Sequence, residues 1–66
     1  MEFKCRLKVI FAERDIAQGE FADRIGVSAA AISAIKNSHS LPSFPVLYRI
    51  CEELDMDMRE IWIRVK

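Results

Sequence analysis

Gly26 stands between two short segments in which apolar residues recur at helical spacing. Because glycine adopts positive φ at little steric cost, a glycine in this position is a common end for a helix. Ser28 follows two residues later, where its side chain can cap the start of another helix. Ala22, within the first segment, is small enough to let a second helix pack closely against it. We therefore expect two short helices, joined by a tight turn, within residues 18–35.

Apolar residues at spacings of three and four predict five short helices along the whole chain. In chain order, the apolar sets are Leu7, Ile10 and Phe11; Phe21, Ala22 and Ile25; Ile32 and Ile35; Leu47, Ile50, Cys51 and Leu54; and Met58, Ile61 and Trp62. Ser43 precedes a helix start that has a proline in its first turn, where proline is tolerated. Asp57 and Glu60 have the spacing of a capping box at the start of the last helix.

The two ends of the chain follow a different period. Within Met1–Lys4 and Trp62–Lys66, apolar and charged residues alternate, which is typical of strands. We expect these ends to pair as a small two-stranded antiparallel ribbon. The predicted fold is therefore all-α, with five helices and this short ribbon. A chain of 66 residues is enough for one domain, so residues 1–66 are expected to form a single domain.

The charge balance argues against a strongly electropositive surface. Ten basic and ten acidic residues give a net charge of +0 and a pI near 6.6, whereas many DNA-binding domains are basic. The sum hides an uneven distribution, since residues 51–60 carry five acidic side chains and a single basic one. Any basic surface therefore lies elsewhere on the chain and is weak.

Enzymatic, metal-binding and membrane functions find little support in the sequence. The chain has one histidine and no identifiable nucleophile beside a base. Few residues could therefore carry out acid–base catalysis, so we expect no enzyme. Cys5 and Cys51 with that histidine lack zinc-ligand spacing, and we expect buried, reduced thiols and no metal or cofactor. No apolar run approaches the ~18 residues of a membrane span, and no signal peptide is visible. No small-molecule ligand is evident, and a cytoplasmic location is expected.

Two stretches of the chain carry a family resemblance. Residues 18–38 read QGEFADRIGVSAAAISAIKNS and residues 41–62 read LPSFPVLYRICEELDMDMREIW. They resemble the helix-turn-helix and the fourth and fifth helices of the lambda-repressor/Cro-like family, also called the xenobiotic-response-element family. The resemblance runs from Leu7 to Trp62 and places the helix-turn-helix proper near 18–37. It implies a transcriptional regulator, a repressor, that binds double-stranded DNA at a two-fold operator as a homodimer.

The resemblance also implies roles for individual residues. The second helix opens with a residue that holds a DNA phosphate or a neighbouring side chain, and residues 28–37 form the recognition helix that reads the bases. Main-chain N–H groups at the start of the fourth helix could receive a phosphate. Apart from the resemblance, a lysine at the end of the recognition helix and a histidine in the following loop are further phosphate candidates, although both could equally be ordinary solvent-exposed side chains. The expected DNA-binding residues are therefore Gln18, Ser28, Ala29, Ala30, Ser33, Ala34, Lys36, Asn37, His39 and Ser43.

The recognition helix departs from the family because Ala29, Ala30 and Ala34 occupy three of the four base-reading positions. Alanine cannot make the hydrogen bonds that distinguish guanine or adenine, and it can only touch a thymine methyl group. One interpretation is a helix that approaches the bases closely and reads thymine methyls and DNA shape. The other is that alanine only favours the helix and that DNA binding is weak or lost. A protein-interaction module with the same fold would fit the second interpretation.

A chain this short buries a limited fraction of its surface, and dimerisation is a common remedy. Met58, Ile61 and Trp62 give the last helix an apolar edge. We expect this edge to be the homodimer interface, although Ile61 or Trp62 could also serve the core of a single copy. A two-fold dimer of this kind would place two recognition helices about 34 Å apart, one turn of DNA.

Overall fold

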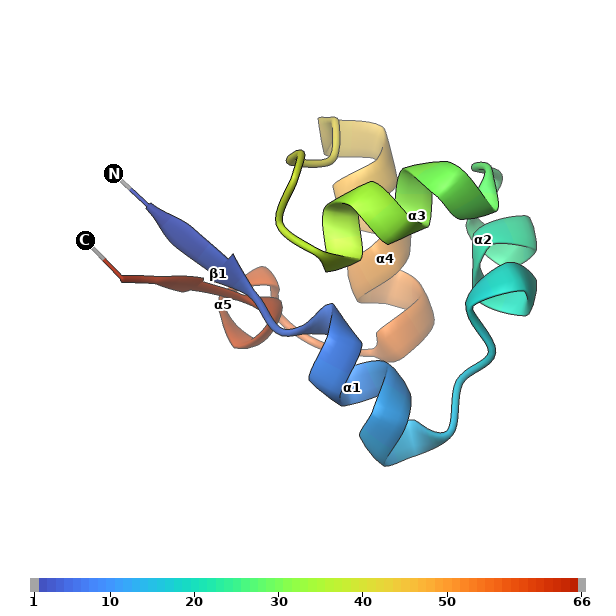
Figure 1. Cartoon of the computed structure of the whole chain (residues 1–66), viewed down its shortest axis with the longest axis horizontal. Coiled ribbons are helices and arrows are strands. Elements are labelled where there is room, and N and C mark those ends of the chain that lie inside the picture. Colours follow the sequence, from blue (N-terminus) through green and yellow to red (C-terminus); the bar gives the residue numbers. More distant parts are fainter. Residues whose placement is uncertain (1, 66) are drawn as a thin grey trace.

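The computed structural model describes residues 2–65. In order along this part of the chain lie β1 (Phe3–Cys5), α1 (Leu7–Arg14), α2 (Gln18–Ile25), α3 (Ala29–Lys36), α4 (Phe44–Leu54), α5 (Met58–Ile61) and β2 (Trp62–Arg64). The helices gather around one core, and the two strands lie side by side and project from it (Figure 1). The predicted helical fold, with an antiparallel ribbon formed by the chain ends, is therefore confirmed.

The ribbon joins the two ends of the described chain in a defined register. The facing pairs are Phe3 with Arg64, Lys4 with Ile63, and Cys5 with Trp62. The bounds differ from the prediction, because β1 continues to Cys5 and because Met1 and Lys66 lie outside the described residues. Trp62 opens β2 instead of closing the last helix, and its φ of −108° and ψ of 111° are extended. Pairing with Cys5 thus takes the place of another helical turn.

Every helix contributes one side to the core. The largest fully buried side chains are Leu7, Ile32, Ile50 and Ile61, which come from α1, α3, α4 and α5. α2 contributes Phe21, whose ring lies 4.9 Å from that of Phe11 between centroids. Burying a side chain of this size stabilises the fold by about 1.5–3 kcal/mol. α3 is therefore anchored through its inner side, which leaves its outer side free to carry function.

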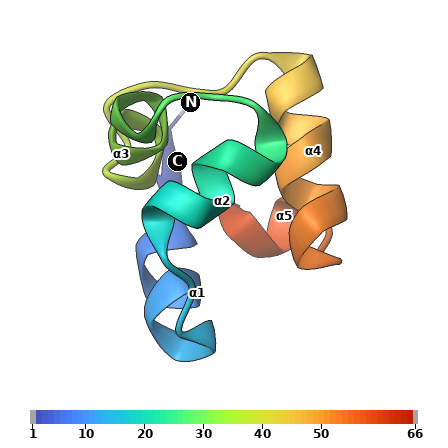
Figure 2. The same cartoon turned by 90° about the vertical axis from the view of Figure 1, so that its right-hand side faces the viewer.

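Two arginines bind the ends of neighbouring helices. Arg14 Nη1 donates a hydrogen bond to the Leu54 carbonyl at 2.8 Å, and Arg49 Nη2 donates to the Arg24 carbonyl at 2.8 Å. The last carbonyls of a helix have no hydrogen-bond partner within the helix. These arginines therefore donate to carbonyls that would otherwise hydrogen-bond to water. Since Arg24 lies in the last turn of α2, Arg49 fixes α2 against α4. Figure 2 shows α2 between α3 and α4, so this bond also steadies the helix that carries the candidate site.

Candidate nucleic-acid interface

The turn between α2 and α3 has the geometry that the sequence predicts. Gly26 ends α2 with a φ of 78°, a conformation that glycine adopts without the strain of a side chain. Ala22 is 1% exposed, in line with close packing at this point. Ser28 then caps α3, since its Oγ accepts a hydrogen bond from the Ala31 N–H at 3.1 Å. The start of α3 is thus fixed by residues close to it in the sequence.

α3 turns its large apolar side chains inward and its small side chains outward. Ile32 and Ile35 are 0% and 5% exposed. The four predicted base-reading residues are more accessible: Ala29 and Ala30 are exposed, and Ser33 and Ala34 are half-buried. Alanine and serine reach only one or two heavy atoms beyond the backbone. This side of α3 can therefore approach another surface closely, and Ser33 is its single polar group among the four.

Gln18 links the start of α2 to both ends of α3. Its Nε2 donates a hydrogen bond to the Ala29 carbonyl at 3.0 Å, and its Oε1 accepts one from Lys36 Nζ. Lys36 therefore folds back along α3 and is half-buried. Of the two roles expected for Gln18, the contact with a neighbouring side chain is the one present in this structure. Ala29 and Lys36 are seven residues apart and therefore lie on one side of α3, but this spacing alone does not indicate that Gln18 of α2 lies beside them.

The two ends of the predicted recognition helix, 28–37, are the caps of α3 and not helical residues. Asn37 is exposed, and its Nδ2 lies 3.5 Å from Ser33 Oγ, to which it donates. His39 is exposed as well, and its main-chain N–H donates to the Ala34 carbonyl at 2.8 Å. Asn37 and His39 are thus held against the last turns of α3 by hydrogen bonds to Ser33 and Ala34, two of the predicted base-reading residues.

Ser38 has no predicted role, yet it connects α3 to the ribbon. Its Oγ accepts a hydrogen bond from the Cys5 N–H at 3.3 Å. Its φ of 63° is left-handed, which is uncommon for a residue with a side chain. The position just after a helix cap is a known place for such a conformation. The contact with Cys5 has no sequence signal, because the two residues are 33 positions apart.

Ser43 is the N-cap of α4 and is exposed, but its side chain makes no capping hydrogen bond. Pro45 lies in the first turn and has no N–H to satisfy. The main-chain N–H of Phe44 therefore has no partner within the helix. In Figure 1 the loop from α3 to α4 leaves one end of α3 and rises to the start of α4, and in Figure 2 it runs along the top of the molecule. The start of α4 thus adds a hydrogen-bond donor on the side of the molecule where the other predicted residues lie.

The three residues expected at a dimer interface do not share one exposed edge. Ile61 is 0% exposed and Trp62 8%, because both pack into the core, whereas Met58 is 48% exposed. α5 has only four residues, so the chain turns into β2 before the helix can present a longer apolar stripe. Met58 is thus the main accessible residue of the three.

Two further features of residues 2–65 bear on function, the potential metal ligands and the two cysteines. This part of the chain contains no group of three or more His, Cys, Asp or Glu residues that could hold a metal ion, and none of its helices has the length and hydropathy to cross a membrane. Cys5 and Cys51 are free and half-buried. Burial raises the pKa of both thiols above the ordinary value, so they stay protonated near neutral pH.

Comparison with known proteins agrees with this geometry. Residues 7–61, more than four fifths of the chain, match a family model described as Helix-turn-helix. A comparison with curated proteins finds no match. The matched family is a DNA-binding regulatory family of the Cro/C1 type and not a family of enzymes. The chain belongs to the lambda-repressor/Cro-like helix-turn-helix family of DNA-binding transcription regulators.

Proposed function

We propose that this chain is a sequence-specific repressor that binds a two-fold operator in double-stranded DNA as a homodimer, with α3 in the major groove. The proposal treats residues 1–66 as one domain acting in the cytoplasm. The observation that supports it most is the outer side of α3, where Ala29, Ala30, Ser33 and Ala34 leave the backbone free to approach the bases. The inner side of the same helix is locked in the core through Ile32.

Sequence is read mainly through methyl groups and DNA shape. The three alanines cannot supply the hydrogen-bond discrimination of ~1–3 kcal/mol per base pair that longer polar side chains give. Ser33 is the single polar reader, and it also accepts from Asn37 Nδ2 at 3.5 Å. Contacts with thymine methyls and the cost of deforming the duplex then provide the specificity. We expect a site rich in A·T pairs and a modest ratio of specific to non-specific affinity.

Phosphate contacts position the helix in the groove. Gln18, Lys36, Asn37 and His39, together with the main chain at Ser43, surround the outer side of α3 and would contact the backbone. Lys36 is the one lysine or arginine among them, and its Nζ already donates a hydrogen bond to Gln18 Oε1. Since each neutralised phosphate contributes about 0.9 to the slope of log affinity against log salt, we expect a shallow slope for this protein.

A salt titration of DNA binding tests the proposal. Duplexes are first selected from a random pool with the full chain, and their affinity is then measured by fluorescence anisotropy at several salt concentrations. Lys36→Ala should weaken binding to all sequences about equally and reduce the slope by about one unit. Lys8→Ala removes the same charge from an exposed position on α1, on the opposite side of the molecule from the top of α3 in Figure 1. This control should leave the slope unchanged.

Replacing thymine by uracil in the selected half-site isolates the methyl contacts. The substitution should lower affinity at two or more positions and leave the salt slope intact. Unchanged affinity at every position, or a selected site dominated by invariant G·C pairs, would contradict methyl reading. No binding above background at low salt would instead favour a second candidate function, a protein-interaction module. Two observations support that candidate: the outer side of α3 has few polar side chains, and the chain has a net charge of +0.

A further inference from the structure

Charge is unevenly divided between the ribbon and the helical body. The ribbon and its flanks, residues 2–6 and 59–65, carry four basic and two acidic side chains, a net charge of +2. The other described residues, 7–58, carry five basic and eight acidic side chains, a net charge of −3. The ribbon is therefore a positive projection attached to a negative body. A polyanion is attracted to the first and repelled by the second.

Most cations of the helical body are already bound within the protein. Of its five basic residues, four make a hydrogen bond or an ion pair with another residue: Arg14, Arg24, Lys36 and Arg49. Lys8 is the fifth and is exposed. Lys4 in β1 is also exposed, and its side chain makes no hydrogen bond or ion pair within residues 2–65. The ribbon thus carries charge that a partner can use.

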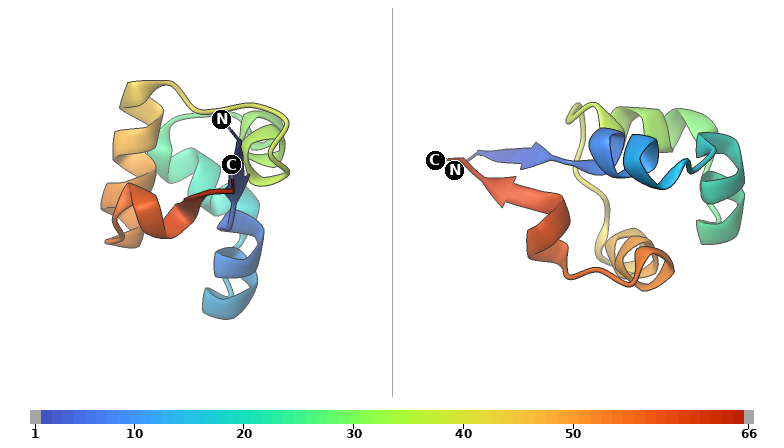
Figure 3. Two further views of the ribbon diagram at one scale, coloured as in Figure 1. Left: turned by 90° about the vertical axis from the view of Figure 1, so that its left-hand side faces the viewer. Right: turned by 90° about the horizontal axis from the view of Figure 1, so that it is seen from below.

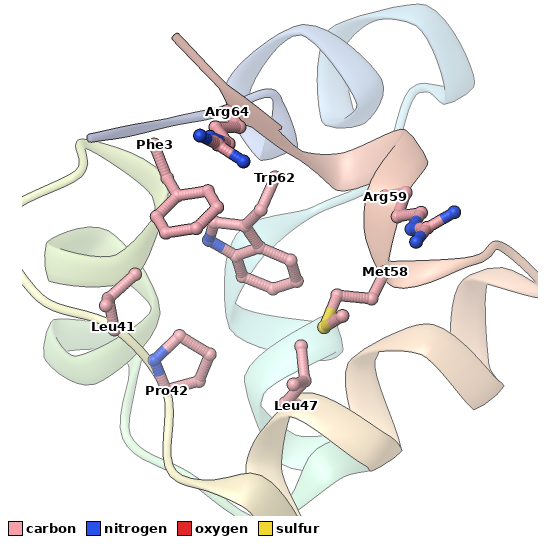
Figure 4. A pocket seen from close by; sticks show the side chains of 8 residues that line it. All are labelled: Phe3, Leu41, Pro42, Leu47, Met58, Arg59, Trp62 and Arg64. Carbon is pink, nitrogen blue, oxygen red and sulfur yellow. The ribbon is translucent and has the colours of Figure 1, made fainter. Parts of the chain in front are cut away.

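The ribbon presents long basic side chains on both of its faces. Phe3 faces Arg64 in the register, and Lys4 faces Ile63. Because side chains alternate along a strand, Arg64 lies on the same face as Phe3, and Lys4 lies on the opposite face. Figure 4 shows the Arg64 side chain beside Phe3 and Trp62, at the edge of the pocket that these residues line. Lys4 and Arg64 are both exposed.

The ribbon begins where the recognition helix ends. Cys5, the residue after Lys4, donates its N–H to Ser38 Oγ at 3.3 Å. Ser38 directly follows Asn37, which is the C-cap of α3. In the right-hand view of Figure 3, β1 lies in the same layer as α1 and α3, whereas β2 and α5 lie in the layer of α4. β1 is therefore the strand nearer to the candidate DNA-binding surface.

We propose that the ribbon is a second DNA contact, in which Lys4 and Arg64 bind phosphates beside the groove that holds α3. This contact rests on the proposed function, since α3 in the major groove would bring the ribbon to the backbone beyond the C-terminal end of that helix. Double-stranded DNA carries one charge per about 1.7 Å of its axis, so phosphates lie within reach of a projection there. Phosphate contacts carry no base information. The ribbon adds affinity, and α3 selects the site.

The test is the salt dependence of DNA binding by the full chain and two neutral variants, Lys4→Gln and Arg64→Gln. Affinity is measured by fluorescence anisotropy on the selected duplex and on a duplex of random sequence. Each variant should lower the slope of log affinity against log salt by about 0.9, and the double variant by about 1.8. Between about 50 and 200 mM salt, the ratio of parent to variant affinity should fall about threefold for each cation lost. The losses should be equal on both duplexes.

Two control variants separate a local contact from overall charge. Lys8→Gln removes the same charge from an exposed position on α1 and should leave the slope unchanged. Arg64→Lys keeps the charge in the ribbon and should retain the slope of the parent. Phosphate ethylation interference then locates the contact, because phosphates bound by the ribbon should matter for the parent and not for the double variant. Circular dichroism checks that each variant is folded.

Unchanged slopes in both glutamine variants would overturn the ribbon contact, and so would an equal fall in Lys8→Gln. The two proposals can fail separately, because Lys36→Ala tests α3 and these variants test the ribbon. A slope that depends on Lys36 and not on Lys4 or Arg64 removes the ribbon contact alone. A slope that depends on Lys4 and Arg64, with no preference for the selected duplex, removes the proposed function alone. No binding to any duplex at low salt removes both.

Discussion

The turn between α2 and α3 and the ribbon of β1 and β2 are held by contacts of very different range. At the turn, Ser28 caps a helix that begins at the next residue, and Gln18 reaches Ala29, which is 11 positions away. At the ribbon, the Arg6 N–H donates to the Ile61 carbonyl at 2.8 Å, from the opposite end of the chain. The candidate DNA-binding surface thus depends on local signals, whereas the ribbon exists only after the chain ends have met.

The two regions also differ in what they leave exposed. The outer side of α3 presents small side chains whose polar neighbours are hydrogen-bonded to one another. The ribbon presents the larger side chains of Phe3 and Ile63 beside the long basic side chains of Lys4 and Arg64. A surface of the first kind suits close approach to a regular polymer such as DNA. A surface of the second kind reaches a phosphate from further away, so we expect it to add affinity without sequence preference.

The largest expected effect comes from removing the side chain where the ribbon meets the core. Ile61 has no exposed surface, so Ile61→Ala should leave a cavity and lower the free energy of unfolding by about 2–5 kcal/mol. The measurement is urea denaturation followed by circular dichroism. Val9→Ala shortens a side chain of the same β-branched kind at a half-exposed site and should change stability by less than about 0.5 kcal/mol. If Ile61→Ala has the same free energy of unfolding as the parent, the Ile61 side chain beside the ribbon does not stabilise the core.

A smaller effect, with opposite signs at two glycines, tests the local turn. Gly26 has a positive φ, and an added Cβ would meet nothing within 4 Å there or at Gly19. Backbone strain is therefore the only cost at Gly26, and Gly26→Ala should destabilise the fold by about 1–2 kcal/mol. Gly19 lies inside α2, where alanine is favoured, so Gly19→Ala should stabilise by up to about 1 kcal/mol. Thermal melts of both variants check this, and shifts of the same sign would mean that the turn is wrongly assigned.

The same contrast of local and distant contacts explains how far the sequence could be interpreted. Gly26 and Ser28 act within a few residues, so the turn and the start of α3 were predictable. The ribbon was predictable as an alternating pattern, but its register depends on the meeting of two distant ends. Trp62 shows the limit, because it fits the period of the last helix and also that of a strand. The strand prevails through pairing with Cys5.

Within the candidate site, the positions on α3 were predictable and the side-chain contacts were not. The bond between Lys36 and Gln18 depends on how α3 crosses α2, which spacing along one helix does not determine. The sequence left open whether Ile61 lies in the core or at an exposed edge, because a helix of four residues is too short for its period to indicate which side faces the core. Ser38 was missed because its partner lies in a strand whose position is set by the opposite end of the chain.

The smallest expected effect concerns Ser38, where the two regions touch. Its left-handed φ disfavours a side chain, while its Oγ accepts the hydrogen bond from the Cys5 N–H. Ser38→Ala keeps the strain and loses the acceptor, so it should destabilise by about 0.5–1.5 kcal/mol. Ser38→Gly loses the acceptor but relieves the strain, so it should stay within about 0.5 kcal/mol of the parent. Thermal melts resolve this difference, since 1 kcal/mol moves the Tm of so small a domain by about 4–8 °C.

A Ser38→Ala variant as stable as Ser38→Gly would mean that the strain is negligible. Both variants melting well below the parent would mean that the bond to the ribbon outweighs it, and that α3 depends on the chain ends more than its local signals suggest.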